Sequence, residues 1–211
     1  DNVTSRNRLP FIVGGTGFYI QAALYDFDFE KEPKGDTKTK YQHLSNEGLH
    51  LLLAEIDYKE AKKIHPNNRR RVLRAIEIYE NRQKTKSDII TSQKKDLLYD
   101  AYIVGLSTER KTLYEKINRR VDNMMNEGLL IEVKGLYDKG YRVEAICYKE
   151  FEYYFSGEKT LPEVTELIKR NTRRYAKRQM TYFRHKLPVN WFDAEMTEKV
   201  YEEIDSWIGK G

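Results

Sequence analysis

The chain has 211 residues, of which 39% are apolar and 34% are charged, and a net charge of +5. Its 16 Tyr, 8 Phe and 2 Trp can build a hydrophobic core, which argues against a disordered chain. No apolar run is long enough to cross a bilayer and no apolar signal segment opens the sequence, so neither a membrane span nor secretion is expected. The single cysteine excludes an internal disulfide and an all-cysteine zinc site, and a reducing, cytoplasmic setting is expected.

The first predicted element is a buried strand at residues 9–13 (LPFIV), which ends at a Gly-rich turn, residues 14–17 (GGTG). A helical pattern follows, and the order strand, Gly-rich turn, helix is typical of an α/β unit with a parallel sheet. Two further strands are predicted at residues 102–106 (YIVGL) and 190–192 (NWF). Because a parallel strand needs neighbours on both sides, three strands make a poor sheet, and we expect part of the core to precede residue 1.

Most of the remaining chain is predicted to be helical. Helices are expected at about residues 67–80, 107–127, 129–138, 161–186 and 196–208. Ser107 or Thr108 is expected to cap the second of them, and Pro162 suits the first turn of the fourth. We divide the chain into a core part with the GGTG turn (1–34), a helical insert domain (35–95) and a return to the core with a basic helix (96–211).

The basic helix is the most informative feature of the sequence. Residues 169–186 contain eight Lys and Arg and no Asp or Glu, so this window contributes +8 to a net charge of +5 and leaves −3 for the rest. Cations recur every four residues, as Lys169 and Arg170, Arg173 and Arg174, and Lys177 and Arg178. On a helix this spacing forms one stripe of mutually repelling charges, which favours an anionic partner such as nucleic acid. The alternative is a solvated face whose cations pair with carboxylates elsewhere in the chain.

A second basic motif, residues 65–71 (HPNNRRR), precedes the helix predicted from residue 67. Either Asn67 or Asn68 is expected to cap this helix, and Arg70, Arg71 and Arg74 project from its first turns. One face should pack against the protein: Val72, Ala75, Ile76 and Tyr79. Backbone N–H groups and the helix dipole favour phosphate at such a helix start, but an ordinary capped basic helix explains the motif equally well.

Other signals are weak. The GGTG turn is not a Walker A loop, and it either faces a ligand crevice or is a tight turn that needs glycine for positive φ. Cys147 has no histidine nearby in sequence and is disfavoured as a nucleophile. The four histidines lack metal-ligand spacing, so no metal site is predicted within these residues.

Four stretches, in this order, resemble the tRNA dimethylallyltransferase (tRNA isopentenyltransferase) family: 12–20 (IVGGTGFYI), 65–79 (HPNNRRRVLRAIEIY), 146–150 (ICYKE) and 173–184 (RRYAKRQMTYFR). The second and fourth are specific, and the GGTG turn only corroborates them. The family departs from this sequence in two ways. Its members begin with a P-loop followed by an Asp-Ser pair, neither of which is found here, and they usually have Gly where Cys147 stands. These 211 residues also contain no match to the zinc-finger extension of eukaryotic relatives.

The resemblance implies an α/β fold with a P-loop nucleotide-kinase-like parallel sheet core, incomplete here, and an inserted helical tRNA-binding domain. It implies transfer of a dimethylallyl group from dimethylallyl diphosphate to the exocyclic N6 of the adenosine on the 3′ side of the tRNA anticodon. Mg²⁺ is expected, with most of its ligands upstream of residue 1, and the general-base Asp is expected upstream as well. A monomeric enzyme that binds the anticodon stem-loop is expected, and this stretch alone should be inactive.

The resemblance also implies residue roles. Thr16, Arg110 and Arg120 are the catalytic candidates, and Gly14, Gly15, Arg110 and Arg120 are candidates for binding the substrate diphosphate. The tRNA-binding candidates are Thr16, Lys40, Arg70, Arg71, Arg74, Cys147, Tyr148, Lys149, Arg173, Arg174, Lys177, Arg178, Gln179, Thr181 and Arg184. Two alternatives of other classes remain: a non-catalytic RNA-binding module and a P-loop nucleotide kinase-like enzyme.

Overall fold

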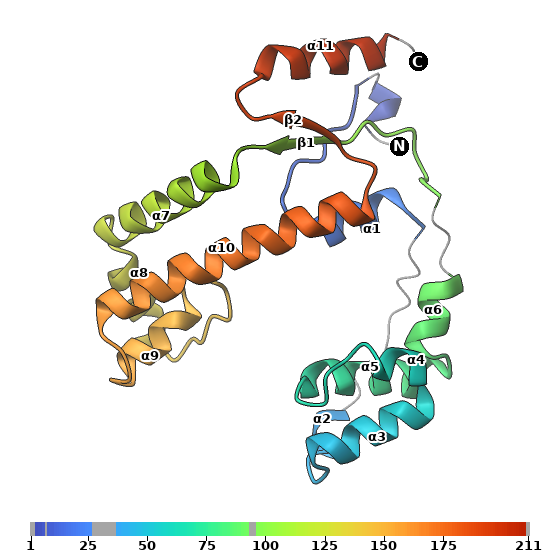
Figure 1. The fold of residues 1–211 in the computed structure, drawn as a ribbon, viewed down its shortest axis with the longest axis vertical. Helices are drawn as coiled ribbons and strands as arrows, with labels where there is room; N and C mark the ends of the chain where they lie inside the picture. The colour runs from blue at the N-terminus through green and yellow to red at the C-terminus, as the bar shows by residue number, and fades with distance from the viewer. Residues whose placement is uncertain (1–2, 7, 27–36, 93–95, 210–211) are drawn as a thin grey trace. The chain divides into compact units, whose positions relative to one another are not determined.

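The computed structural model of the chain describes residues 3–6, 8–26, 37–92 and 96–209. It consists of two compact units, one formed by residues 1–21 with 100–211 and the other by residues 22–99 (Figure 1). The predicted domain boundaries, after residues 34 and 95, fall on residues outside the described ranges and stay predictions.

The described part of the unit of residues 22–99 is helical. Its helices are α2 (Thr37–Lys40), α3 (Asn46–Ile56), α4 (Tyr58–Ala61), α5 (Arg69–Arg82) and α6 (Lys86–Ser92). The core lies between α3 and α5, where Leu49, Leu53, Val72, Ala75 and Ile76 are buried. The apolar face predicted for α5 is therefore confirmed for its first three members, whereas Tyr79 is only partly buried.

Asp57 connects two helices of this unit through one carboxylate. It is the N-cap of α4, where Oδ1 accepts a hydrogen bond from the Glu60 N–H (3.0 Å). Its Oδ2 accepts one from the N–H of Ser87, in α6 (2.9 Å). Burial opposes ionisation of Asp57, but hydrogen bonds from Ser87 and from the Glu60 backbone outweigh it, so the pKa of Asp57 lies below its ordinary value of 3.8.

We expect Asp57→Ala to lower the free energy of unfolding by about 2 kcal/mol, because two buried N–H groups lose a charged acceptor. A carboxylate with a depressed pKa stabilises the fold above pH 3.8, and this contribution is lost as the pH falls through the folded-state pKa. Urea unfolding between pH 7 and pH 3 should show that Asp57→Ala flattens the acid side of the stability curve. Asp205→Ala, an exposed position on another helix, is the control and should change stability by less than about 0.5 kcal/mol.

The other unit is a mostly helical α/β structure with a small parallel sheet. Strands β1 (Val104–Ser107) and β2 (Asn190–Asp193) pair in parallel, with Val104 opposite Asn190 and Ser107 opposite Asp193. Its helices are α1 (Gly17–Leu24, which continues into the other unit), α7 (Arg110–Asn126), α8 (Leu129–Asp138), α9 (Glu152–Phe155), α10 (Leu161–Lys186) and α11 (Thr197–Ile208), with 3-10 turns η1 (Thr4–Arg6) and η2 (Lys149–Phe151).

The long helix α10 organises this unit. Its N-terminal half packs against α7 and η2, as Figure 1 shows for the α7 contact, and buries Val164 and Ile168 with Phe151. Its start is fixed locally by a capping box of Thr160 and Glu163, and by Pro162 in the first turn. The predicted span of this helix is confirmed.

Two local predictions were wrong. Residues 9–13 form no strand: Phe11, Ile12 and Val13 are 71%, 57% and 93% exposed. A strand needs a partner ladder, and within the described residues β1 and β2 pair only with each other. Ser107 does not cap α7, because it lies in β1 and its hydroxyl donates to the carbonyl oxygen of Phe192 (3.2 Å); the N-cap position is Glu109.

Candidate nucleic-acid interface

The Gly-rich turn lies directly against the C-terminal half of α10. Gln179 Nε2 donates a hydrogen bond to the carbonyl oxygen of Gly15 (2.6 Å). A Cβ atom on Gly15 would lie 2.2 Å from that nitrogen, and one on Gly17 would lie 2.4 Å from a ring carbon of Tyr182. Neither glycine has positive φ. Glycine therefore allows the close approach of side chains from a helix here, and the positive-φ alternative is wrong.

Thr16 stands between these two contacts, at the start of α1. Its carbonyl oxygen accepts hydrogen bonds from the N–H groups of Tyr19 (2.9 Å) and Ile20 (3.2 Å). Its side chain is exposed and has no hydrogen-bond partner among the described residues. The hydroxyl is thus presented to solvent next to the N-terminus of a helix and is available to a ligand.

Most cations in the C-terminal half of α10 face the other way. Two residues turn a helix by about 200°, so Lys177 and Thr181, two residues on either side of Gln179, point away from the Gly-rich turn. An open hollow along the helix is lined by residues from both sides: Arg174, Lys177, Arg178, Thr181 and His185 from the far side, and Tyr182 and Lys186 from the side of the turn. The hollow therefore extends from these cations to Tyr182, which packs against Gly17 of the turn.

The far side of α10, termed here the cationic face, consists of Arg170, Arg174, Lys177 and Arg178 with Thr181 and His185. All four of these cations are exposed, and no carboxylate in the described part of the chain lies within 4.0 Å of any of them. Like charges four residues apart on a helix repel. An anion that binds such a face neutralises the repelling charges, so its binding is favourable.

The stripe predicted from residue 169 is shorter than expected. Lys169 forms ion pairs with Asp122 of α7 (2.7 Å) and with Glu166 (3.0 Å), and only 13% of its side chain is exposed. The Asp122 hydrogen bond outweighs burial and raises the pKa of Lys169. Arg173 is partly buried and donates to Asn118 Oδ1 (2.5 Å). For Lys169 the interpretation as an internally paired cation is therefore correct, and both residues hold α7 against α10.

The two arginines proposed for the diphosphate lie on α7. Arg110 is its first residue, next to the end of β1, and its Nε donates to the hydroxyl of Tyr114 (3.0 Å). Arg120 is exposed ten residues later. Ten residues of helix rise about 15 Å, so the described structure does not bring the two guanidinium groups together along this helix.

The loop before η2 contains a feature that the sequence did not reveal. Cys147 has a φ of 77°, a left-handed conformation that favours glycine. Its N–H donates to Oε2 of Glu150 (2.9 Å), a residue only 1% exposed, and Oε1 of Glu150 accepts from Asn171 Nδ2 of α10 (2.8 Å). Burial raises the pKa of the Cys147 thiol, which further disfavours a nucleophilic role. Glu150 thus anchors the loop that carries Tyr148 and Lys149.

The conformation of Cys147 explains why the resemblance implies glycine at this position. The free energy of unfolding of Cys147→Gly should exceed that of Cys147→Ala by about 1 kcal/mol. Alanine keeps a Cβ, which is strained in left-handed backbone, and glycine has none. This corresponds to about 2–4 °C in melting temperature for a protein of this size. Both variants lose the thiol, so the comparison isolates backbone strain. Equal melting temperatures would mean that the loop relaxes away from this conformation.

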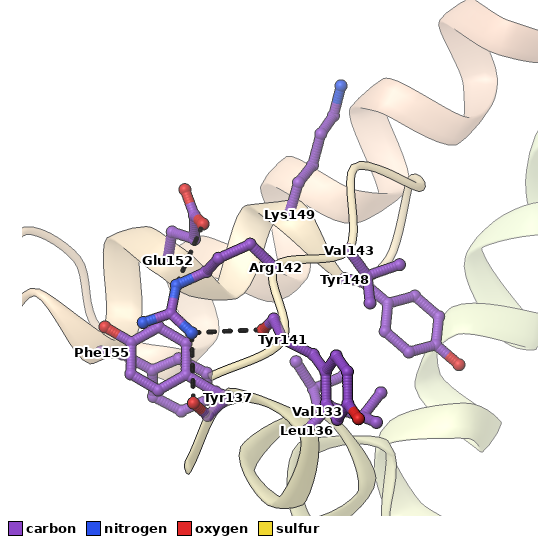
Figure 2. A pocket seen from close by; sticks show the side chains of 10 residues that line it. All are labelled: Val133, Leu136, Tyr137, Tyr141, Arg142, Val143, Tyr148, Lys149, Glu152 and Phe155. Atoms are coloured by element: carbon purple, nitrogen blue, oxygen red, sulfur yellow. Dashed lines mark hydrogen bonds and ion pairs between the residues drawn. The ribbon is translucent and has the colours of Figure 1, made fainter. Parts of the chain in front are cut away.

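A small cavity lies behind the same loop, between α8 and α9 (Figure 2). Arg142 closes it: its guanidinium lies 3.7 Å from the ring centroid of Tyr137 and donates to the carbonyl oxygens of Tyr137 (3.1 Å) and Tyr141 (3.2 Å). The guanidinium also forms an ion pair with Glu152 (3.8 Å). The space left is about 10 Å³, room for one water at most, so this cavity holds no base or prenyl chain.

In the unit of residues 22–99 the candidate cations have different surroundings. Arg70 and Arg71 are exposed in the first turn of α5, with no ion-pair partner in the described ranges. Arg74 pairs with Glu77 (2.8 Å). Arg69 is structural, because its guanidinium donates to the carbonyl oxygen of Tyr41 (2.6 Å), among others. Asn68 occupies the predicted N-cap position of α5, but its side chain makes no capping bond.

Lys40 is also engaged within this unit. It forms an ion pair with Glu80, and its ammonium lies 5.1 Å from the ring centroid of Tyr41. The Glu80 hydrogen bond raises the pKa of Lys40 above its ordinary value. Anion binding at Lys40 therefore competes with Glu80.

The described ranges support neither a metal site nor a membrane-spanning helix. No group of three or more His, Cys, Asp or Glu side chains is arranged there to hold a metal ion. None of the helices described is both long and apolar enough to span a membrane.

Comparison with known proteins places the chain in a family. A sequence model described as IPP transferase matches residues 1–186. The tRNA dimethylallyltransferase of Bacillus subtilis is 48% identical over 211 residues, covering 96% of this chain and 67% of that protein. That of Anoxybacillus flavithermus is 47% identical over 197 residues, covering 91% of this chain and 63% of that protein.

A solved structure agrees with these relatives. The tRNA isopentenylpyrophosphate transferase from Bacillus halodurans is 41% identical, with a TM-score of 0.64, and the match covers 99% of this chain and 69% of that one. This chain thus spans roughly two thirds of the length of the proteins it matches. Since the family's sequence model covers residues 1–186 of 211, and relatives are close to half identical, the chain belongs to the IPP transferase family.

Proposed function

We propose that this chain is the RNA-holding part of an enzyme that transfers a dimethylallyl group from dimethylallyl diphosphate to the N6 amine of the adenosine 3′ to the tRNA anticodon. Family membership supports the chemistry, because relatives close to half identical are named tRNA dimethylallyltransferases. Family membership does not favour the two alternatives, a non-catalytic RNA-binding module and a nucleotide kinase. The observation that carries the proposal is the cationic face of α10, whose exposed charges have no described carboxylate within ion-pair distance.

The cationic face suits a folded RNA. Its side chains follow the axis of α10 over several turns, so phosphates along one strand meet successive cations. Arg178 also lies over the ring of Tyr175, which is 41% exposed and adds a stacking surface for a base. Arg70 and Arg71, at the N-terminus of α5, offer a second cationic contact on the helical unit. Such contacts fix the position of an RNA and carry little sequence information.

The proposed chemistry needs three things. The departing diphosphate requires cations or backbone donors to neutralise its growing charge, and Arg110 and Arg120 are the candidates on this chain. The adenine amine is a poor nucleophile and requires a general base, which the family resemblance implies is an Asp. The flipped base requires polar contacts that offset lost stacking, and the exposed Thr16 hydroxyl is the candidate.

We also propose that the complete enzyme has a P-loop nucleotide-kinase-like core, uses Mg²⁺, is a monomer and works in the cytoplasm. The described residues contain no cluster of carboxylates or histidines that fits Mg²⁺. The parallel pairing of β1 and β2 is compatible with such a core.

Mass spectrometry of nucleosides tests the proposal. The complete protein is incubated with unmodified tRNA and dimethylallyl diphosphate, the RNA is digested, and the modified nucleoside is located by fragment mapping. We expect one prenylated adenosine, on the 3′ side of the anticodon, in tRNAs that carry adenosine there. An unmodified tRNA, or prenylation at another position, contradicts the proposal.

A further inference from the structure

The contacts between α10 and the Gly-rich turn point to a role for two residues that differs from RNA binding. We propose that Gln179 and Tyr182 are positioning residues that hold the Gly-rich turn, and with it the Thr16 hydroxyl, on the opposite side of α10 from the cationic face. Only the role of the Thr16 hydroxyl in catalysis rests on the function proposed above. The positioning itself follows from contacts within this unit.

Gln179 makes the first of these contacts. Its amide is directed at the turn, where Nε2 donates to the carbonyl oxygen of Gly15 (2.6 Å). That hydrogen bond joins residues 164 positions apart in the sequence, and it leaves the amide turned away from the cationic face. The family resemblance placed Gln179 among the RNA-contacting residues, whereas the geometry assigns its donor to the protein's own backbone.

Tyr182 makes the second contact, one turn further along α10. Its ring lies where a side chain on Gly17 would have to be, and its hydroxyl donates to Oε1 of Gln21 in α1. Gln21 Nε2 in turn donates to the carbonyl oxygen of Lys186, near the end of α10 (3.4 Å). Burial raises the pKa of the Tyr182 hydroxyl, so it stays protonated and able to donate at neutral pH.

Thr16 is therefore held from both sides, since Gly15 and Gly17 each contact α10. Because the same helix carries the RNA-facing cations on its other side, the two faces have a fixed relation along one rigid element. A displacement of about 1 Å in a reacting group costs up to about 100-fold in rate. Loss of the Gln179 contact should therefore slow the reaction without weakening the binding of RNA.

The test compares Gln179→Ala, Tyr182→Phe and Gly15→Ala in the complete protein, with Glu202→Gln on the exposed surface of α11 as the control. The measurements are kcat, KM for tRNA, the dissociation constant of an anticodon stem-loop, melting temperature, and hydrogen exchange of the amides of residues 14–20. We expect kcat to fall about 10-fold in each of the first three variants, with the dissociation constant within about 2-fold of wild type.

The double variant Gly15→Ala/Gln179→Ala sharpens the test. A Cβ on Gly15 displaces the Gln179 amide, so both changes break the same contact, and the double variant should be no slower than either single one. Additive losses would overturn the proposal. So would a loss of RNA affinity in Gln179→Ala that matches its loss of kcat/KM, which would make Gln179 an RNA contact.

Hydrogen exchange separates this inference from the proposed function. In Gln179→Ala the amides of residues 14–20 should exchange faster while the melting temperature stays within a few degrees of wild type. If wild-type protein prenylates no tRNA but this exchange effect is seen, the proposed function fails and the positioning contact stands. Unchanged exchange in an active protein overturns the positioning role.

Discussion

Replacement of Arg174, Lys177 and Arg178 by alanine should weaken binding of an anticodon stem-loop by about 100-fold or more at low salt. These side chains are exposed, and no carboxylate of the described residues pairs with them, so their charge is available to phosphates without breaking an internal ion pair. Each lost phosphate contact should also reduce the slope of log Kd against log salt concentration by about 0.7–0.9, so that the slope falls by about 2–3.

A matched control removes the same charge elsewhere. Lys134, Lys139 and Lys199 are exposed on or next to α8 and α11 and lie outside the cationic face. Their replacement by alanine should leave the salt slope unchanged and weaken binding only slightly, through long-range attraction. Filter binding or fluorescence anisotropy over a series of salt concentrations measures both variants. Equal slopes in the two triple variants would mean that net charge, and not the cationic face, determines RNA binding.

Thr16→Ala in the complete protein should slow prenyl transfer by about 10- to 100-fold and leave the melting temperature nearly unchanged. The hydroxyl is exposed and has no partner among the described residues, so its removal costs the fold no buried hydrogen bond. A hydroxyl that contacts the target base in the transition state, by contrast, contributes a hydrogen bond to a preorganised site.

Thr16→Ser is the matched variant because it keeps the hydroxyl, and it should retain most of the activity. Single-turnover rates with saturating tRNA, measured beside thermal denaturation, distinguish the two roles. If Thr16→Ala loses stability in proportion to rate, or if serine fails to restore the rate, then Thr16 shapes the turn and does not contact substrate.

Elements with local signals were predictable from the sequence. The predicted bounds of α8 and α10 agree with the structure because their ends carry strong local determinants, such as Gly128 and Gly140 around α8 and Pro162 at the start of α10. The packed face of α5 followed from helical periodicity alone. The two sheet strands were predicted at residues 102–106 and 190–192, and they are observed at 104–107 and 190–193.

Features that depend on tertiary contacts were not predictable in the same way. Residues 9–13 have the composition of a buried strand, but burial is decided by partners that no local pattern reveals. Lys169 belongs to the sequence stripe, yet it pairs with Asp122 on a different helix. A cysteine gives no signal of left-handed backbone, and only the glycine usual in the family at position 147 points to it. The roles of Gln179 and Gly15 emerge only when the turn and α10 are seen in contact.

Chemical footprinting of lysines tests the cationic face most directly. The complete wild-type protein is acetylated with and without a saturating anticodon stem-loop, and the modified lysines are quantified by mass spectrometry. We expect RNA to protect Lys177 strongly from acetylation, while Lys134 and Lys199 react equally in both samples. If Lys177 is as reactive with bound RNA as without it, the RNA lies elsewhere and does not bind the cationic face.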